Sequence, residues 1–159
     1  MQRRLPAIIF IFIFVFAVAV QAAARGSVVI REWDVPTPGS LPHDPAVSRD
    51  GALWYTGMLS DTLGRLDTST GKVEDWPSPG GADSRPYGIA ATPDGKIWYS
   101  ESGVNPNTIV CFDPKLKTFE AWPIPSGGGV VRHMVSTPEG DLYIACSGKN
   151  KVGVVKMSR

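Results

Sequence analysis

The chain has 159 residues, of which 43% are apolar and 19% are charged, and its formal net charge is +1. This composition is typical of an ordinary folded domain. The positive residues are scattered and form no basic surface for a phosphate backbone, so we expect no nucleic-acid partner. The two cysteines, Cys111 and Cys146, are too few for a disulfide framework, and we expect free, buried thiols.

The N-terminus has the pattern of an export signal. Arg3 and Arg4 precede an unbroken apolar run over residues 7–20, and small residues follow at 22–24. This predicts a signal peptide over residues 1–24 and a periplasmic or secreted protein. The run is shorter than the roughly 20 residues that cross a bilayer, so we expect no stable membrane span after cleavage, with an uncleaved anchor as the alternative.

Residues 25–159 form one predicted domain that contains three copies of one unit. In each copy an acidic residue and a glycine precede an aromatic segment, at intervals of 44 and 45 residues. A tryptophan recurs at intervals of 43 and 46 residues. These positions are Asp50, Asp94 and Glu139, and Trp33, Trp76 and Trp122. The copies cover about residues 32–74, 75–120 and 121–159.

Within each copy the sequence favours four short strands. In the second copy they cover residues 87–92, 96–100, 108–112 and 118–122. Asp94-Gly95 suits a tight turn between the first two strands. Aromatic and β-branched residues fill the strands, and proline and glycine are confined to connections. Four-stranded antiparallel sheets with a period of about 40–50 residues predict an all-β fold, the β-propeller, in which each sheet is one blade.

The two ends of the predicted domain match parts of a blade. Residues 28–35 resemble a fourth strand, and residues 152–157 resemble a third strand. We therefore expect the N-terminal strand to complete the last blade. Three blades cannot comfortably surround an axis, which leaves three alternatives: half of a six-bladed ring shared by a homodimer, an internally deleted version of a longer gene, and an open wedge.

Three phrases carry a resemblance to a known family. They are Pro-His-Asp-Pro-Ala-Val at 42–47, Leu-Gly-Arg-Leu-Asp at 63–67 and Asp-Gly-Lys-Ile-Trp-Tyr-Ser-Glu at 94–101. The sequence resembles the virginiamycin B lyase (streptogramin B lyase) family over residues 28–159. The resemblance implies a seven-bladed propeller, of which this chain would lack about four blades. It also implies ring opening of a cyclic depsipeptide by elimination, in which a histidine removes an α-proton and Mg²⁺, helped by glutamates, stabilises the developing charge.

The resemblance also indicates where site residues would lie. The family has a histidine at the start of the first strand of a blade and a glutamate 14 residues later, at the end of the second strand. The corresponding pairs here are His43 with Gly57, Tyr87 with Glu101, and Arg132 with Cys146. No copy has both residues. A site would therefore be split between blades.

This pattern gives five candidate site residues. His43 and Glu101 are the candidate catalytic residues, and Glu101 is also the candidate metal ligand. Tyr87, Arg132 and His133 are candidate substrate-binding residues, although His133 lies one place beyond the matching position and we expect it to face the other way. His43 has a second interpretation, a structural hydrogen bond to a loop of the neighbouring blade.

Three functions stay open from the sequence. The first is an exported propeller that binds a small molecule or a peptide. The second is an enzyme, a carbon–oxygen lyase of the virginiamycin B lyase type that acts with Mg²⁺ on a cyclic peptide. The third is an interaction domain of the cell envelope.

Overall fold

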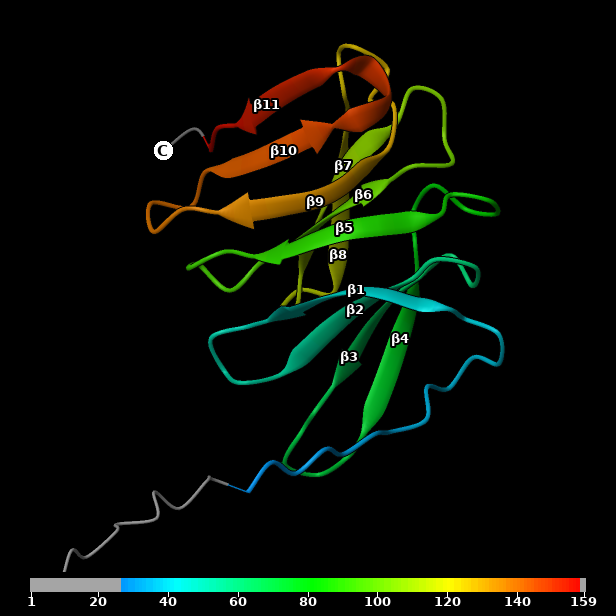
Figure 1. The fold of residues 1–159 in the computed structure, drawn as a ribbon, viewed down its shortest axis with the longest axis vertical. Coiled ribbons are helices and arrows are strands. Elements are labelled where there is room, and N and C mark those ends of the chain that lie inside the picture. Colours follow the sequence, from blue (N-terminus) through cyan, green and yellow to red (C-terminus); the bar gives the residue numbers. More distant parts are fainter. Residues whose placement is uncertain (1–26, 158–159) are drawn as a thin grey trace, which may run out of the picture. The chain divides into compact units, whose positions relative to one another are not determined.

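The computed structural model describes residues 27–157, so the predicted signal peptide over residues 1–24 lies outside the described residues. The described residues form three antiparallel sheets, which we call blades 1, 2 and 3 (Figure 1). Blade 1 contains β1 (Pro42–Val47), β2 (Leu53–Gly57), β3 (Thr62–Leu66) and β4 (Val73–Pro77). Blade 2 contains β5 (Pro86–Ala91), β6 (Ile97–Glu101), β7 (Thr108–Asp113) and β8 (Thr118–Pro123). Blade 3 contains β9 (Val131–Ser136), β10 (Leu142–Cys146) and β11 (Lys151–Val155), with a 3₁₀ turn at Ser147–Lys149.

The predicted blades and turns are confirmed. Neighbouring strands in the chain are neighbours in each sheet, as expected for tight connections. The amide of Gly95 donates to the carbonyl of Thr92 at 2.9 Å, which closes the predicted turn between β5 and β6. The corresponding bonds close the turns at Gly51 and Gly140, at 2.9 and 3.0 Å. The repeated acidic-glycine pair therefore does mark the first hairpin of every blade.

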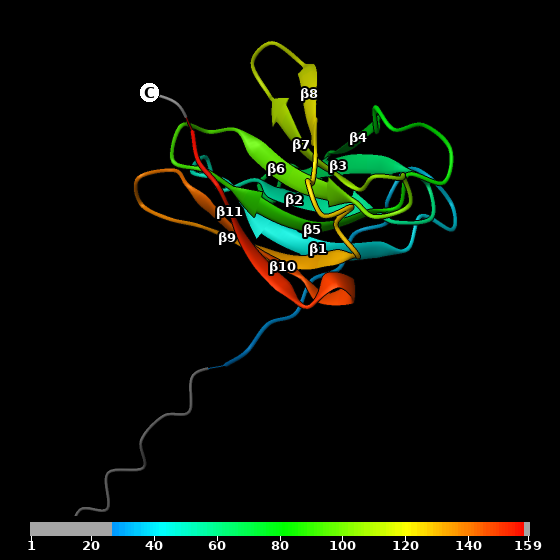
Figure 2. The ribbon, with the colours of Figure 1, turned by 90° about the horizontal axis from the view of Figure 1, so that it is seen from above.

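Blade 3 differs from the expectation, because it has three strands. Residues 27–35 form no strand, so the prediction that they complete the last blade within this chain is wrong. Part of the reason is that the segment before β1 is attached to blade 1. Thr37 donates a hydrogen bond to Asp75 of β4 at 2.8 Å, and Ser40 bonds Ser60 at 2.7 Å. Blades 1 and 3 pack on different sides of blade 2, so the three sheets form no closed ring (Figure 2).

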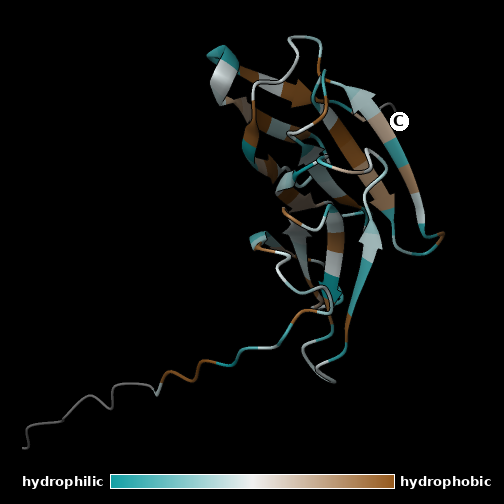
Figure 3. Cartoon of the chain, turned by 90° about the vertical axis from the view of Figure 1, so that its right-hand side faces the viewer, coloured by the Kyte–Doolittle hydropathy of each residue, from teal (hydrophilic) through white to brown (hydrophobic). Residues whose placement is uncertain are grey.

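Two apolar interfaces join the blades. Trp54 and Leu63 of blade 1 pack against Ile97, Tyr99 and Phe112 of blade 2. On the opposite face of blade 2, Trp98 and Ile109 belong to a second cluster with residues of blade 3, which are Val131, Leu142, Ile144 and Cys146. Hydrophobic residues are accordingly concentrated in the strands (Figure 3). Blade 2 is thus covered on both faces.

Two of the three repeated tryptophans, Trp76 and Trp122, pack within their own blades. Trp76 of β4 stacks on Trp54 of β2, with ring centroids 5.7 Å apart and an interplanar angle of 25°. Trp122 of β8 stacks on Trp98 of β6 at 5.6 Å and the same angle. The fourth strand of a blade therefore contributes an aromatic ring that covers the aromatic ring of the second strand.

Truncation at the first interface should destabilise the fold. Leu63 is fully buried, so Leu63→Ala should lower the free energy of unfolding by about 2–5 kcal/mol through lost burial and a residual cavity. Urea denaturation followed by tryptophan fluorescence measures this. Leu116, which is 71% exposed in the turn before β8, provides the matched control. Leu116→Ala should change stability by less than about 0.5 kcal/mol, and an equal effect of both variants would contradict the assigned interface.

Candidate functional site

The first strands of the three blades, β1, β5 and β9, lie side by side with β5 in the middle (Figure 1). Each pairs with the second strand of its own blade through the same irregularity, in which two residues oppose one. The two-residue bulges are His43-Asp44, Tyr87-Gly88 and Arg132-His133. A bulge re-aims side chains, so it lets two consecutive residues serve one site. Four of the five predicted site residues lie in these bulges.

One carboxylate lies between two imidazole rings. Nδ1 of His43 is 3.2 Å from Oδ1 of Asp44, and Nδ1 of His133 is 3.2 Å from Oδ2 of the same residue. The prediction that His133 faces away is therefore wrong, because the bulge in β9 breaks the alternation of an ordinary strand. A carboxylate only accepts hydrogen bonds, so Nδ1 of His43 is the donor to Asp44, and Nε2 is the nitrogen that would accept a hydrogen bond in a neutral ring.

Tyr87 connects the histidines to a cation. Its ring centroid is 3.9 Å from that of His43, with an interplanar angle of 35°. The guanidinium carbon of Arg132 lies 5.7 Å from the Tyr87 ring, on the neighbouring blade. His43, Asp44, Tyr87, Arg132 and His133 together form what we call the histidine cluster. It combines an aromatic surface, a cation and imidazole nitrogens at a solvent-accessible position.

Close backbone packing positions these side chains. A Cβ atom on Gly88 would lie 2.7 Å from the carbonyl oxygen of Arg132, so only glycine allows β5 and β9 to approach this closely. Between β1 and β5, the Thr56 hydroxyl donates to the carbonyl of Tyr87 at 2.7 Å and accepts from the amide of Asp44 at 3.3 Å. Asp44 is not among the five candidate site residues that the sequence indicated. The only sequence signal for Asp44 was that it follows His43 at the position that Gly88 and His133 occupy in the other two repeats.

Glu101 lies in a different environment. Its side chain is 1% exposed, and Oε1 accepts hydrogen bonds from the Ser78 hydroxyl and the Gly80 amide, both at 2.6 Å. Oε2 accepts from the Thr108 hydroxyl at 2.6 Å. Such a carboxylate holds the β4–β5 connection against β6 and β7. None of its described hydrogen bonds involves His43, so the structure does not join the two candidate catalytic residues.

Blade 1 fills the corresponding position with hydroxyl groups. A Cβ atom on Gly57 would lie within 2.5 Å of hydroxyl oxygens of Ser40, Ser60 and Thr62. Ser60 bonds Ser40 and Thr62, each at 2.7 Å. A glutamate at position 57 would therefore need this network to move. The hydroxyl cluster explains in physical terms why the family's second residue is absent from blade 1.

The residues present do not fit a magnesium site. Both oxygens of Glu101 already accept hydrogen bonds from hydroxyl and amide groups, and the buried carboxylate presents no open face to a cation. Within residues 27–157, no group of three or more His, Cys, Asp or Glu side chains is arranged to hold a metal ion. The same residues contain no helix long and apolar enough to span a bilayer.

Two hollows lie beside blade 3. The first, of about 1170 Å³, lies between β11 and the β7–β8 face of blade 2 and contains none of the histidine cluster among its lining residues. The second, of about 690 Å³, covers the opposite face of blade 3 and includes His133, Tyr143, Val152 and Val154. The histidine cluster therefore continues into the open face of blade 3 through His133.

Glu101 provides a test of its structural placement. Glu101→Ala should lower the free energy of unfolding by about 2 kcal/mol, because it leaves the buried Ser78 hydroxyl and the partly buried donors of Gly80 and Thr108 without this acceptor. Glu120→Ala, at an exposed position of β8, is the matched control and should be nearly neutral. Chemical denaturation of both variants measures the difference. A Glu101→Ala protein as stable as the control would contradict the structural assignment.

The cysteines should be unreactive in the folded protein. Both are free and buried, as predicted, and burial raises the pKa of the Cys111 thiol to about 12 and also raises the pKa of Cys146. At pH 8 only roughly one Cys111 thiol in 10⁴ is ionised, and the thiolate is the reactive form. Labelling with a disulfide reagent at pH 8 should be slow in buffer and complete in urea. Rapid labelling of the folded protein would contradict the burial of these thiols.

A family model and solved structures of known proteins match this chain. The model of the virginiamycin B lyase family matches residues 19–159. Selenomethionine-substituted virginiamycin B lyase from Staphylococcus aureus superposes with a TM-score of 0.72 and 27% identity, covering 80% of this chain and 42% of that one. A catalytically inactive variant of the S. aureus enzyme, solved with quinupristin, gives a TM-score of 0.70 and 27% identity, covering 79% and 41%.

A structure of streptogramin B lyase shares the fold, with a TM-score of 0.68 and 24% identity, covering 78% of this chain and 39% of that one. A search of the curated proteins found no match. The chain spans about two fifths of the length of the solved lyases it matches. Its three sheets therefore correspond to part of a β-propeller, and the chain belongs to the virginiamycin B lyase family.

Proposed function

We propose that this protein binds a small molecule or a peptide at the histidine cluster and acts outside the cytoplasm, in the periplasm or the medium. The observation that carries the proposal is the single carboxylate of Asp44 between His43 and His133, beside the ring of Tyr87. The localisation rests on the charged and apolar pattern of residues 1–24.

The cluster has the chemistry of a recognition site for a peptide-like ligand. Tyr87 offers an aromatic surface, and the Arg132 guanidinium beside it can donate hydrogen bonds to carbonyl or carboxylate oxygens. Nε2 of His43 is free to accept from an amide, since Nδ1 is used by Asp44. Quinupristin, with which a family relative was solved, is a suitable first probe.

Lyase activity is the second candidate, and the orientation of His43 favours it. Asp44 holds Nδ1 of this ring, which leaves Nε2 to take a proton from a bound substrate. In an elimination the α-proton would move to His43, the C–O bond of the ring ester would break, and the product would be one linear molecule that carries both the new alkene and the released carboxylate. Arg132 is the cation of the cluster that would stabilise the developing oxyanion, because Glu101 does not fit a magnesium site.

Calorimetric titration with quinupristin tests the binding proposal. We expect measurable binding that His43→Ala and Tyr87→Ala each weaken by about fivefold or more, since each removes part of the stacked pair. Lys115→Ala, in the exposed turn after β7, should leave binding unchanged and is the control. Absence of binding, or equal affinity of all variants, would contradict the proposal.

Chromatography and mass spectrometry of the same mixtures separate binding from catalysis. Elimination yields an isomer of unchanged mass with a new retention time and ultraviolet absorbance, whereas hydrolysis adds the mass of one water. A new isomer that disappears in His43→Ala would support the lyase candidate. Unchanged quinupristin with measurable affinity would support binding alone.

A further inference from the structure

Blade 3 lacks the strand that completes the other two blades. In blades 1 and 2 the third strand is covered by β4 and β8, but within residues 27–157 no strand pairs with the outer edge of β11. The exposed edge carries backbone groups without ladder partners, and its side chains Val152 and Val154 are 89% and 47% exposed. Such an edge is a template for another strand.

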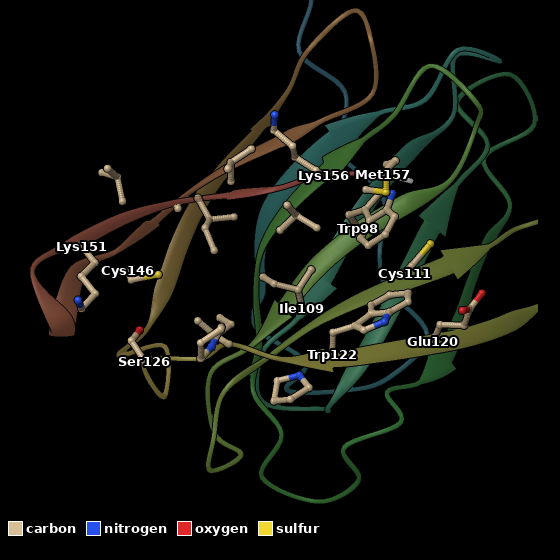
Figure 4. A pocket seen from close by; sticks show the side chains of 18 of the residues that line it. Trp98, Ile109, Cys111, Glu120, Trp122, Ser126, Cys146, Lys151, Lys156 and Met157 are labelled. Atoms are coloured by element: carbon tan, nitrogen blue, oxygen red, sulfur yellow. The ribbon is translucent and has the colours of Figure 1, made fainter. Parts of the chain in front are cut away.

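A groove beside this edge has the size and lining that a fourth strand requires. The hollow of about 1170 Å³ lies between β11 and the outer strands of blade 2 (Figure 4). Trp122, Ile109 and Ile124 line one side, and Val155 and Met157 line the other. In blade 2, by comparison, Phe119 of the fourth strand occupies the matching position and packs against Phe112 with ring centroids 4.6 Å apart.

Residues 28–35 have the side chains that fit the missing strand. Val28, Val29 and Ile30 are 86%, 74% and 82% exposed. When Trp33 is aligned with Trp76 and Trp122, the register of the complete blades predicts the partners along β11. Leu63 opposes Trp76 and Ile109 opposes Trp122, so Val152 would oppose Trp33. By the same rule Val154 would oppose Arg31, Val155 would oppose Ile30, and Lys151 would oppose Asp34.

This register would bring two pairs of side chains together, one of opposite charge and one aromatic. Asp34 and Lys151 would form an opposite-charge pair across the strands. Tyr143 of β10 occupies the position of Trp54 and Trp98 and is 54% exposed. Trp33 would stack on it, as Trp76 stacks on Trp54. The exposed ring of Tyr143 would then be covered by a tryptophan, as the rings of Trp54 and Trp98 are in the other two blades.

We propose that residues 28–35 of a second copy of this chain form the fourth strand of blade 3. Within one chain, the residues that connect this segment to β1 are attached to blade 1 through the bond from Thr37 to Asp75, whereas blade 3 lies across blade 2. A second copy brings its blade 1 with the donated strand, and this blade covers the open face of Tyr143, Val152 and Val154. Exchange in both directions gives a symmetric dimer with six blades in one ring.

The exchange would also extend the histidine cluster. Around the ring, β1 of the second copy would follow β9, as β5 follows β1 and β9 follows β5. The bulge of that strand would then lie next to His133, which lines the hollow on the open face of blade 3. The interface and the cluster are therefore continuous, and each ring would contain two clusters.

Native mass by light scattering tests the dimer. The purified protein should have twice the mass of one chain. Ile30→Lys would place a charge in the groove of the dimer and should raise the dimer dissociation constant about tenfold or more. Since Ile30 is 82% exposed in the single chain, the monomer should remain folded by circular dichroism. Val28→Lys is the matched control. When Trp33 is aligned with Trp122, Val28 falls on Lys117, just before β8, so blade 2 already has a lysine at this position and the variant should not weaken the dimer. A monomeric protein, or equal effects of the two variants, would overturn the proposal.

Disulfide trapping tests the register. The double variant Arg31→Cys with Val154→Cys places two thiols opposite each other and should give a covalent dimer on oxidation. Glu32→Cys with Val154→Cys is shifted by one residue, directs the first thiol to the other face and should give at most a few per cent of that product. A disulfide formed within one chain would overturn the exchange, and equal yields from both variants would overturn the register.

Discussion

The structure depends on one constraint, which is that each blade has two apolar faces and buries them only against other blades. Blade 2 satisfies it fully, with Tyr99 and Phe112 on one face and Trp98 and Ile109 on the other. Blade 3 satisfies it on one side only and exposes Tyr143 and Val152 on the other. Burial of apolar area is the main favourable term in folding, so an uncovered blade face favours association.

The same packing creates the histidine cluster. Blade contact brings β1, β5 and β9 together, and hydroxyl groups of the second strands fix their spacing, as Ser100 does by donating to the carbonyl of Val131 at 2.7 Å. Gly88 permits the close approach of β5 to β9. Three two-residue bulges then direct side chains from all three blades to one place. No single blade could form the cluster, because Asp44 contacts histidines of blades 1 and 3.

The repeat made most of the fold predictable from the sequence. The turn at Gly95 and the stacked pair of Trp76 and Trp54 follow from local patterns that recur three times. Features that depend on tertiary contacts could not be predicted from the sequence in the same way. The bulge that turns His133 toward Asp44 has no local signal, since nothing in a single strand shows how many residues its partner opposes. The burial of Glu101 depends on Ser78, in the β4–β5 connection, and on Thr108 of β7.

Blade 3 links the assembly of the ring to the chemistry of the cluster. The side chain of His133 is 80% exposed because, within residues 27–157, no blade lies beyond β9, whereas Asp44, next to blade 2, is only 17% exposed. A blade packed on that face would remove water from one side of the contact between His133 and Asp44, and polar interactions strengthen when water is excluded. The imidazole of His133 would then be held between its carboxylate and a new protein surface. A complete ring would therefore order a residue that three blades leave in solvent.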